Sequence, residues 1–281
     1  MKSEPKKAGP SGPPWNGRAG VAWIESQEML DRLLRPIEDH LVGTVLARPG
    51  TAVLDVGCGT GTTTLAAARM VGRGSKIVGI DISEPMIAAA RQRAEQVPSP
   101  PEFIAANAAT YSFEPQSFGT IISRFGLMFF DDPIPAFANL RRAAKEGAEL
   151  RFFAWRGPED NPFMITAERA AAPFLADLPR RRADAPGQFG LADRERTCRI
   201  LEQAGWEAAD IRPYDMDCVL LESELESYFT RLGPLGLVLP DVDVATRKQI
   251  VEEVRAAFEP FVQGGEVRFT AACWIGRAHA P

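Results

Sequence analysis

From Thr51 onward, short apolar runs alternate with amphipathic stretches along this 281-residue chain. Each apolar run has the length of a buried strand, and each stretch between runs has the length and spacing of a helix. The predicted strands are Thr51–Val56, Lys76–Asp81, Pro100–Ala106, Phe118–Arg124, Ala148–Trp155, Trp206–Leu220 and Glu266–Ile275. Strands and helices in alternation form βαβ units. The sequence therefore predicts an α/β fold with a doubly wound, mostly parallel, seven-stranded sheet.

Helices are expected between these strands and upstream of them. The predicted helices are Thr60–Val71, Ser83–Gln96, Asp132–Ala144, Met164–Ala176, Asp193–Gln203, Ser223–Leu232 and Val244–Phe261. Upstream, the pattern of Trp15–Val45 predicts one amphipathic helix, or two helices separated at Pro36. Residues 1–14 are rich in Lys, Pro, Gly and Ser and predict a disordered lead.

Composition and charge narrow the classes of protein. Hydrophobic residues make up 45% of the chain and charged residues 25%, as in ordinary globular proteins. The net charge of −5 argues against a protein whose main task is to bind nucleic acid. No stretch approaches the ~20 apolar residues that span a bilayer. The four cysteines predict neither a zinc site nor disulfides, so a reduced, cytoplasmic protein is expected.

The strongest chemical signal is the segment Asp55-Val-Gly57-Cys-Gly59-Thr-Gly61, where the first strand turns into a helix. Glycines let the backbone approach a ligand closely. The G-x-G-x-G spacing differs from the G-x-G-x-x-G of dinucleotide-binding proteins, and the segment lacks the Gly-Lys-Ser/Thr of a P-loop. Asp55 suits a ligand with an ammonium or sulfonium group. Asp81 ends the second strand, where an acid typically binds ribose hydroxyls.

This combination resembles the class I S-adenosylmethionine-dependent methyltransferases, which have a seven-stranded, Rossmann-like fold. Val53–Gly61 is similar to the first motif of that family. Gly79–Met86 is similar to the second motif, in the form common among ubiquinone/menaquinone-type small-molecule methyltransferases. Phe125–Pro133 and Asn139–Ala143 resemble that subgroup as well. The resemblance implies S-adenosylmethionine as the cofactor.

The resemblance also implies roles for particular residues. The glycine loop would hold the methionine portion, Asp81 the ribose, Ile82 and Met86 the adenine ring, and Asn107-Ala108 the adenine amine. The expected cofactor-binding residues are Asp55, Gly57, Cys58, Gly59, Gly61, Asp81, Ile82, Met86, Asn107, Ala108 and Arg124. Asn107 departs from the family, which usually has Asp at this position.

Apolar residues after the fourth and fifth strands indicate an acceptor site. Phe125 and Trp155 follow these strands directly, at the edge where open α/β sheets bind ligands, although core packing explains such residues equally well. The expected acceptor-binding residues are Phe125, Met128, Phe129, Trp155 and Phe163. Arg124 would orient a polar edge of the acceptor or lie near the cofactor. The expected acceptor is a small hydrophobic or aromatic molecule.

No catalytic residue is predicted, because the sulfonium already activates the methyl group and alignment of a nucleophile suffices. Tyr111, Tyr214 and Asp131 stay open as bases for an acidic acceptor. The two histidines, His40 and His279, are expected on the solvated surface. The acids near the strand ends suit a helix N-terminus better than a metal ion, so no metal is expected.

The predicted organisation is one methyltransferase domain over residues 15–281. It comprises N-terminal helices at 15–50, a cofactor-binding core at 51–156, a lid insertion at 157–190, and the rest of the sheet with its helices at 191–281. Two alternatives stay open, namely a nucleic-acid or protein methyltransferase and a non-catalytic cofactor-binding protein. Enzymes that methylate base amines typically carry Asn/Asp-Pro-Pro-aromatic where this chain has Ser123–Gly126. The sequence does not decide whether the chain forms a homo-oligomer.

Overall fold

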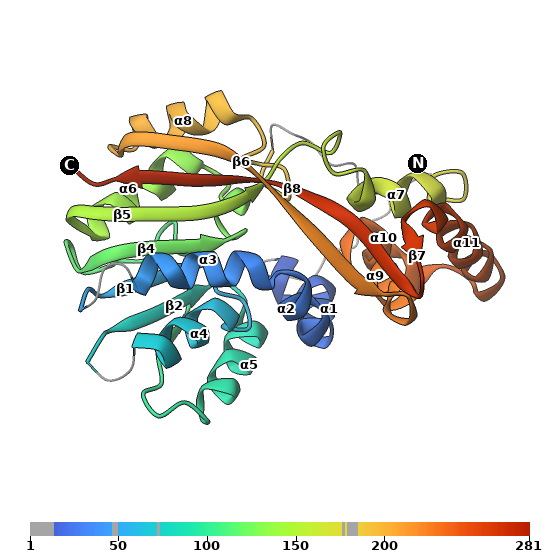
Figure 1. Ribbon diagram of the computed structural model, residues 1–281, viewed down its shortest axis with the longest axis horizontal. Coiled ribbons are helices and arrows are strands. Elements are labelled where there is room, and N and C mark those ends of the chain that lie inside the picture. The colour runs from blue at the N-terminus through green and yellow to red at the C-terminus, as the bar shows by residue number, and fades with distance from the viewer. Residues whose placement is uncertain (1–13, 47–49, 72–73, 176–177, 179–184) are drawn as a thin grey trace, which may run out of the picture.

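A mixed sheet runs through the molecule, as the computed structural model shows for residues 14–46, 50–71, 74–175, 178 and 185–281 (Figure 1). Its strands are β1 (Val53–Val56), β2 (Ile77–Asp81), β3 (Glu102–Ala105), β4 (Phe118–Arg124), β5 (Ala144–Trp155), β6 (Glu207–Leu221), β7 (Val262–Gln263) and β8 (Glu266–His279). They lie in the order β3-β2-β1-β4-β5-β8-β6, and the short β7 pairs with β8. The expected disordered lead, apart from Pro14, lies outside the described residues.

The strand directions confirm the predicted fold class. β1 to β5 pair in parallel, and β8 runs antiparallel between β5 and β6. Seven strands form the main path of the sheet, and β7 is an eighth strand that the sequence pattern did not predict. The chain order reverses at β1, which has β2 on one side and β4 on the other. Ligands of open α/β sheets bind at such a switch point, beyond the carboxyl ends of the strands.

Helices cover both faces of the sheet. The α-helices are α1 (Arg18–Glu25), α2 (Gln27–Leu33), α3 (Arg35–Leu46), α4 (Thr62–Val71), α5 (Glu84–Ala94), α6 (Pro133–Ala143), α7 (Pro162–Ala171), α8 (Arg194–Gln203), α9 (Leu225–Arg231), α10 (Gly233–Val238) and α11 (Val244–Ala257). Short 3₁₀ turns occupy Pro14–Asn16, Leu127–Phe129, Glu222–Glu224, Leu239–Asp241 and Glu259–Phe261. α3 and α4 pack together over one face, while α6 and α8 pack together over the other (Figure 1).

Several helix ends follow local sequence signals. Ser83 caps α5, since its hydroxyl accepts a hydrogen bond from the Met86 N–H (3.4 Å), and Asp193 caps α8 in the same manner. The prediction for the N-terminal stretch was wrong in detail, because three helices form there and none is broken at Pro36. Pro36 lies in the first turn of α3, where the missing N–H of a proline costs nothing.

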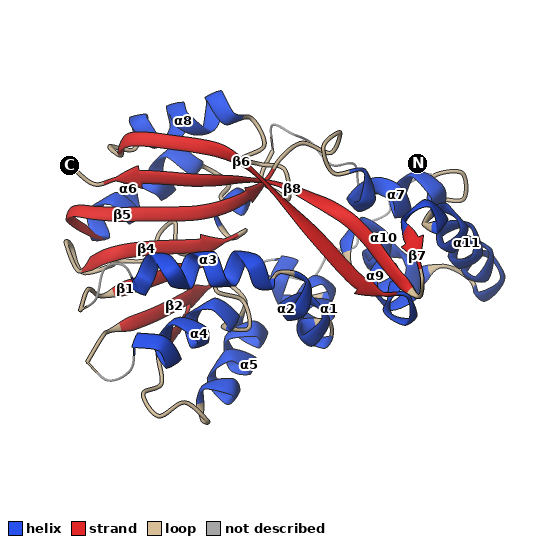
Figure 2. Cartoon of the chain, viewed as in Figure 1, coloured by secondary structure: helices blue, strands red, loops and turns tan. Residues whose placement is uncertain are grey.

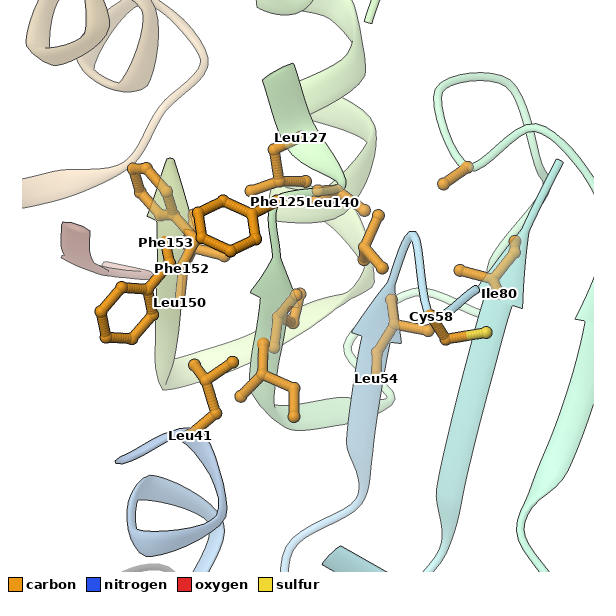
Figure 3. Packing of buried hydrophobic residues seen from close by; sticks show 14 of the residues in the cluster. Leu41, Leu54, Cys58, Ile80, Phe125, Leu127, Leu140, Leu150, Phe152 and Phe153 are labelled. Atoms are coloured by element: carbon orange, nitrogen blue, oxygen red, sulfur yellow. The ribbon is translucent and has the colours of Figure 1, made fainter. Parts of the chain in front are cut away.

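Buried hydrophobic side chains form two clusters. The first surrounds the sheet, and Figure 3 shows part of it, with Leu54 and Ile80 on neighbouring strands and Phe152 on β5. The second cluster lies where β6 and β8 extend beyond the sheet as a two-stranded ribbon, among α7, α9, α10 and α11 (Figure 2). The sequence analysis predicted neither this second cluster nor α10.

The insertion expected at residues 157–190 contributes α7 to the second cluster. Phe163, predicted to bind the acceptor, is only 2% exposed. Its ring stacks on Phe269 of β8 with 3.4 Å between centroids and meets Phe258 edge-on. Phe163 therefore supplies apolar cover for the ribbon, and its predicted contact with the acceptor stays a prediction. Residues 176–177 and 179–184 of the expected lid lie outside the described residues.

Candidate active site

The loop between β1 and α4 is shaped by glycines with left-handed backbone. Gly57 and Gly61 have φ values of +70° and +80°. A Cβ atom at Gly57 would lie 2.5 Å from the Gly126 Cα atom, and one at Gly61 would lie 2.7 Å from the Phe103 ring. Neither position has room for a side chain. The loop therefore packs closely against the chain that follows β4 and against β3, as a ligand-binding turn requires.

Gly59, between these two glycines, faces a looser space. It too is left-handed, with φ of +55°. A Cβ atom here would meet only the Met86 Sδ atom at 3.7 Å and the Trp23 indole nitrogen at 3.9 Å. Met86 itself is buried beneath the loop, and Ile82 beside it is partly exposed. Of the two predicted adenine-binding side chains, Met86 thus lies next to Gly59.

The carboxylate of Asp81 is held in place by backbone N–H groups. The Gly59 N–H donates to its Oδ2 atom and the Ser83 N–H to its Oδ1 atom, both at 2.8 Å. Burial raises the pKa of Asp81, and these two hydrogen bonds oppose the shift. Each carboxylate oxygen still has a lone pair free to accept another hydrogen bond. The geometry therefore suits a ligand with a pair of hydroxyl groups.

The turn after β3 lies next to Asp81, because the Ala106 N–H donates to the Asp81 carbonyl (2.9 Å). Asn107 is exposed, and its Oδ1 atom accepts from the Ala109 N–H (2.9 Å) in an Asx turn. Ala108 is buried, and its carbonyl accepts from the Asn139 amide (2.9 Å). The Asn107 side chain thus shapes the turn, while its amide nitrogen stays available to a ligand.

Charged side chains of both signs meet beneath the glycine loop. Asp55 is 1% exposed; its Oδ2 atom accepts from the Thr64 hydroxyl (2.6 Å), and its Oδ1 atom has no hydrogen-bond partner. Burial raises the pKa of Asp55 to about 6, although Thr64 and Arg124 oppose the shift. Arg124, at the end of β4, is buried near Asp31, Asp55 and Glu38, and its Nη1 atom lacks a partner. Burial lowers the pKa of this guanidinium, and the three acids oppose the shift.

Cys58 is a small, buried side chain within the loop. Its Sγ atom lies over Gly79 of β2, only 2.9 Å from the position that a Cβ atom would occupy there. Figure 3 shows its side chain between those of Leu54 and Ile80. Burial and the nearby acids Asp55 and Asp81 raise the pKa of the thiol well above its usual value. Cys58 is therefore a neutral thiol with no nucleophilic role.

Phe125 and Trp155 form a stacked pair at the ends of β4 and β5. Their rings are parallel within 4°, with 4.1 Å between centroids. Phe125 has a left-handed backbone (φ +62°), which is rare for a bulky residue and costs on the order of 1 kcal/mol or more. The Phe125 N–H donates to the Phe153 carbonyl (3.1 Å). Figure 3 shows the Phe125 and Phe153 side chains close together. The stack brings together two of the predicted acceptor-binding residues.

The other two predicted acceptor residues in this turn point to different neighbours. Met128 is buried, and its carbonyl accepts from the Gly187 N–H (3.0 Å). Phe129 is partly exposed and meets the Trp15 ring edge-on, with 5.2 Å between centroids. Met128 thus links the turn to the segment before α8, and Phe129 links it to the N-terminal residues.

Residues 14–33, here called the N-terminal strap, lie across the glycine loop and the start of α5. The Ser83 hydroxyl donates to the Trp15 carbonyl (2.7 Å), and the Glu84 N–H donates to the Asn16 side chain (3.1 Å). Trp23 approaches Gly59, as described above. The sequence analysis did not predict these site residues. The only sequence signal for these contacts was the presence of Trp15 and Trp23 on one amphipathic stretch.

Three of the candidate bases and histidines, His40, Tyr111 and Tyr214, pack against aromatic rings. His40 is half-buried between the rings of Phe153 and Tyr214, so its expected place on the solvated surface was wrong. Burial lowers the pKa of His40, and nearby Arg151 adds to the shift. Tyr111 packs edge-on against another aromatic ring. Among the described residues, no three His, Cys, Asp or Glu side chains are grouped to hold a metal ion.

Together these features fit a nucleoside ligand with a charged amino-acid end. Two backbone N–H groups hold the Asp81 carboxylate in a position to accept hydrogen bonds from hydroxyl groups. Asp55 Oδ1 and Arg124 Nη1 are buried and have no hydrogen-bond partner. Residues 53–147 match the family model described as a methyltransferase domain. This part of the chain is a methyltransferase domain. Its residues include the glycine loop, Asp81, Asn107 and the Phe125 turn.

Curated relatives share the methyltransferase domain. The nocamycin O-methyltransferase of Saccharothrix syringae is 38% identical over 105 residues, which are 37% of each chain. A demethylmenaquinone methyltransferase of Bacillus cereus is 34% identical over 104 residues, which are 37% of this chain and 44% of that one. The chain spans about half the length, or less, of the curated relatives it matches.

A solved structure supports the fold over most of the chain. The SAM dependent methyltransferase from Aquifex aeolicus superposes with a TM-score of 0.53. The match covers 92% of this chain and 97% of that one at 16% identity, so it shows the fold alone. Among the described residues, no helix has the length and apolar character needed to cross a membrane.

Proposed function

We propose that this chain transfers a methyl group from S-adenosylmethionine to a small hydrophobic or aromatic acceptor. The observation that carries the proposal is the fixed carboxylate of Asp81 beside the open Gly59 turn. The methyltransferase domain at residues 53–147 supports it. The names of two relatives, which specify nocamycin and demethylmenaquinone, support a small-molecule acceptor.

Different residues of the site would bind different parts of the cofactor. Asp81 would accept hydrogen bonds from the ribose hydroxyls, and Ile82 and Met86 would pack against adenine. Asn107 would donate to the adenine edge through its amide nitrogen, since its Oδ1 atom already accepts from the Ala109 N–H. The buried charges at Asp55 and Arg124 would hold the amino-acid end. When bound, S-adenosylmethionine supplies a methyl group that its sulfonium already activates.

The contribution of the chain to the reaction is then orientation and exclusion of water. The stacked Phe125 and Trp155 rings offer a flat apolar surface next to the loop, suited to a planar acceptor. The N-terminal strap covers the loop and limits access of water. Proximity and orientation supply about 7–11 kcal/mol in favourable cases. No side chain needs to act as a base for an acceptor that is already nucleophilic.

Isothermal calorimetry tests the cofactor. S-adenosylmethionine and S-adenosylhomocysteine should bind, and NAD should give no signal. Asp81→Asn should weaken both sulfur ligands by more than tenfold, because hydrogen bonds to a carboxylate contribute about 1.5–3 kcal/mol each. Asp132→Asn is the matched control, because Asp132 is exposed and makes no capping hydrogen bond. Binding of NAD alone, or an Asp81→Asn variant that binds normally, would contradict the proposal.

A transfer assay tests the acceptor class. Label from S-adenosylmethionine should pass to the small-molecule fraction of a cell extract rather than to its protein or nucleic acid. Transfer should continue in EDTA, because alignment of the acceptor by apolar side chains needs no metal ion. Label found in macromolecules would favour the alternative methyltransferase classes. Loss of activity in EDTA with recovery in magnesium would show a metal-dependent enzyme.

A further inference from the structure

Asn161 is a buried polar side chain between the end of β5 and the start of α7. It is 1% exposed, and its amide bonds only to backbone groups. Its Oδ1 atom accepts from the Ala272 N–H (2.9 Å). Its Nδ2 atom donates to the carbonyls of Ala272 (3.0 Å), Gly157 (3.1 Å) and Arg156 (3.3 Å). The amide therefore joins the turn after β5 to the backbone of β8.

This use of the amide departs from the local sequence signal. Asn161 directly precedes Pro162, the first residue of α7, where an asparagine side chain normally caps the helix. The Asn161 side chain makes no capping hydrogen bond. Only its carbonyl contributes to the helix, by accepting from the Met164 N–H (3.0 Å). The amide thus stabilises the junction with β8 and not the start of α7.

The junction lies where β5 and β8 separate. Trp155 is the last residue of β5 and pairs with Cys273, and the Arg156 N–H still donates to the Ala272 carbonyl (3.0 Å). In a regular antiparallel ladder the Ala272 N–H would donate to the Arg156 carbonyl in return. Here the Asn161 amide lies between these two groups and bonds to both. Asn161 therefore holds the end of β5 to β8 directly after Trp155.

The fork at this junction carries the stacked rings. From residue 271 back to residue 266, β8 pairs with β6 and β7 but no longer with β5, and it continues into the ribbon (Figure 2). The Trp155 ring lies parallel to the Phe125 ring within 4°. This alignment depends on the backbone at the end of β5, which Asn161 fixes from the side of the ribbon.

We propose that Asn161 is a positioning residue for the acceptor. It fixes Trp155 in the stack with Phe125, on which the acceptor lies, and it touches neither ligand itself. This role rests on the proposed function, and it belongs to a residue outside the family-matched segment 53–147. Loss of the amide should therefore impair use of the acceptor and spare the cofactor.

The fluorescence of Trp155 tests the positioning without any acceptor. The Trp155 signal is the difference between the spectrum of a protein and that of its Trp155→Phe counterpart. Asn161→Asp keeps the size of the side chain but buries a carboxylate against three carbonyls, which is unfavourable. The end of β5 should then separate from β8. The Trp155 emission should shift to longer wavelength and become more accessible to acrylamide, and an unchanged signal would overturn the proposal.

Label transfer tests the consequence for the acceptor. The probe is the small-molecule fraction of a cell extract, supplied at graded dilution with saturating labelled S-adenosylmethionine. For Asn161→Asp, kcat/KM for this fraction should fall by about 10- to 100-fold, because a misplacement of ~1 Å is costly in rate. The affinity for S-adenosylhomocysteine, measured by calorimetry, should stay nearly unchanged. A parallel loss of this affinity would show a general structural role and overturn the proposal.

Asn139 provides the matched control on the cofactor side. It is also a buried asparagine, and its amide donates to the carbonyls of Ala108 and Tyr111, at 2.9 Å each. These carbonyls belong to the turn after β3. Asn139→Asp should therefore weaken S-adenosylhomocysteine and leave the Trp155 emission unchanged. If both Asp variants shift this emission alike, loss of a buried amide loosens the whole fold, and the proposal fails.

A second pair of variants covers a failure to fold. If Asn161→Asp does not fold, Asn161→Ala is measured in its place, with Asn139→Ala as its control, because alanine removes the amide without adding a charge. A wild type that passes no label to the small-molecule fraction would overturn the proposed function. The emission of Trp155 would still decide whether Asn161 holds that residue in place.

Discussion

The carboxyl group of Asp55 titrates differently in the folded and unfolded protein. Burial raises its pKa to about 6 in the fold, whereas an unfolded chain has a value near the ordinary 3.8. The folded state therefore holds the proton more tightly between these two values. The contribution of the protonated Asp55 to the stability of the fold is fully present below pH ~4 and is lost as the pH rises through about 6.

This titration predicts a pH-dependent stability difference between the wild type and Asp55→Asn. As the pH rises from 4 to 7, the free energy of unfolding of the wild type should fall relative to the variant by roughly 3 kcal/mol at most. Urea denaturation at several pH values measures this difference in the free energy of unfolding. The effects of the other carboxyl groups cancel, because both proteins contain them. A constant difference across this range would show that Asp55 has an ordinary pKa.

At the scale of single residues, the sequence predicted the polar groups that belong to contiguous motifs. Asp55, Gly59 and Asp81 lie where expected, because a strand followed by a glycine turn constrains its own neighbourhood. Trp23 was not predicted to lie there, since it reaches Gly59 from a helix whose packing depends on the whole fold. The spacing of hydrophobic and polar residues within one segment carries no information about its contacts with distant segments.

At the scale of elements, the turn after β4 carries backbone strain at an aromatic residue. Its Phe125 keeps a left-handed backbone, and the stack on Trp155 compensates for part of that cost. We expect Trp155→Ala to raise the KM for the acceptor at least tenfold, because a flat apolar surface is lost. The affinity for S-adenosylhomocysteine should change less than twofold. Steady-state kinetics with the labelled acceptor, together with calorimetry, measure the two effects.

The neighbouring strand offers a matched control for this prediction. Trp274 on β8 donates its indole N–H to the Ala192 carbonyl (2.7 Å) and takes no part in the stack. Trp274→Phe should therefore leave acceptor use unchanged. If Trp155→Ala weakened cofactor and acceptor equally, the stack would serve the structure of the loop and not the acceptor.

The elements themselves followed from hydrophobic spacing to a large extent. β4 was predicted to the residue, and the parallel strands differ from expectation only at their ends. The ribbon of β6 and β8 differs more from the predicted strands. Apolar and polar residues continue to alternate along it, but its apolar side packs against α7, α9, α10 and α11. The short α10 contains two glycines and a proline, which are poor helix formers, so its existence depends on burial of Leu235 in the second cluster.

On the scale of the whole molecule, the N-terminal strap joins the cofactor loop to the second cluster. Exposed ion pairs connect it to the helices and turns around that cluster: Arg18 with Asp241, Glu25 with Arg231, and Arg32 with Glu224. Because Trp23 lies over Gly59, exchange of the cofactor is expected to require displacement of the strap. Salt weakens exposed ion pairs by screening.

This connection predicts faster ligand release when the strap is loosened. Asp241→Ala should increase the dissociation rate of S-adenosylhomocysteine by roughly two- to threefold at low salt, consistent with the modest strength of exposed pairs. At high salt the wild type and the variant should converge. Glu259→Ala is the control, because it removes an ion pair with Arg255 that does not involve the strap. Equal rates at low salt would separate the strap from ligand exchange.

The placement of the tryptophans gives the molecule an optical reporter of its own. Of the five tryptophans in the chain, Trp15 and Trp23 lie in the strap and Trp155 lies in the stacked pair, whereas Trp206 is fully buried behind α6. A nucleoside entering between strap and loop changes the surroundings of the first two indoles, and an acceptor changes those of the third. Intrinsic fluorescence, without any attached dye, should therefore resolve the order in which the two ligands arrive.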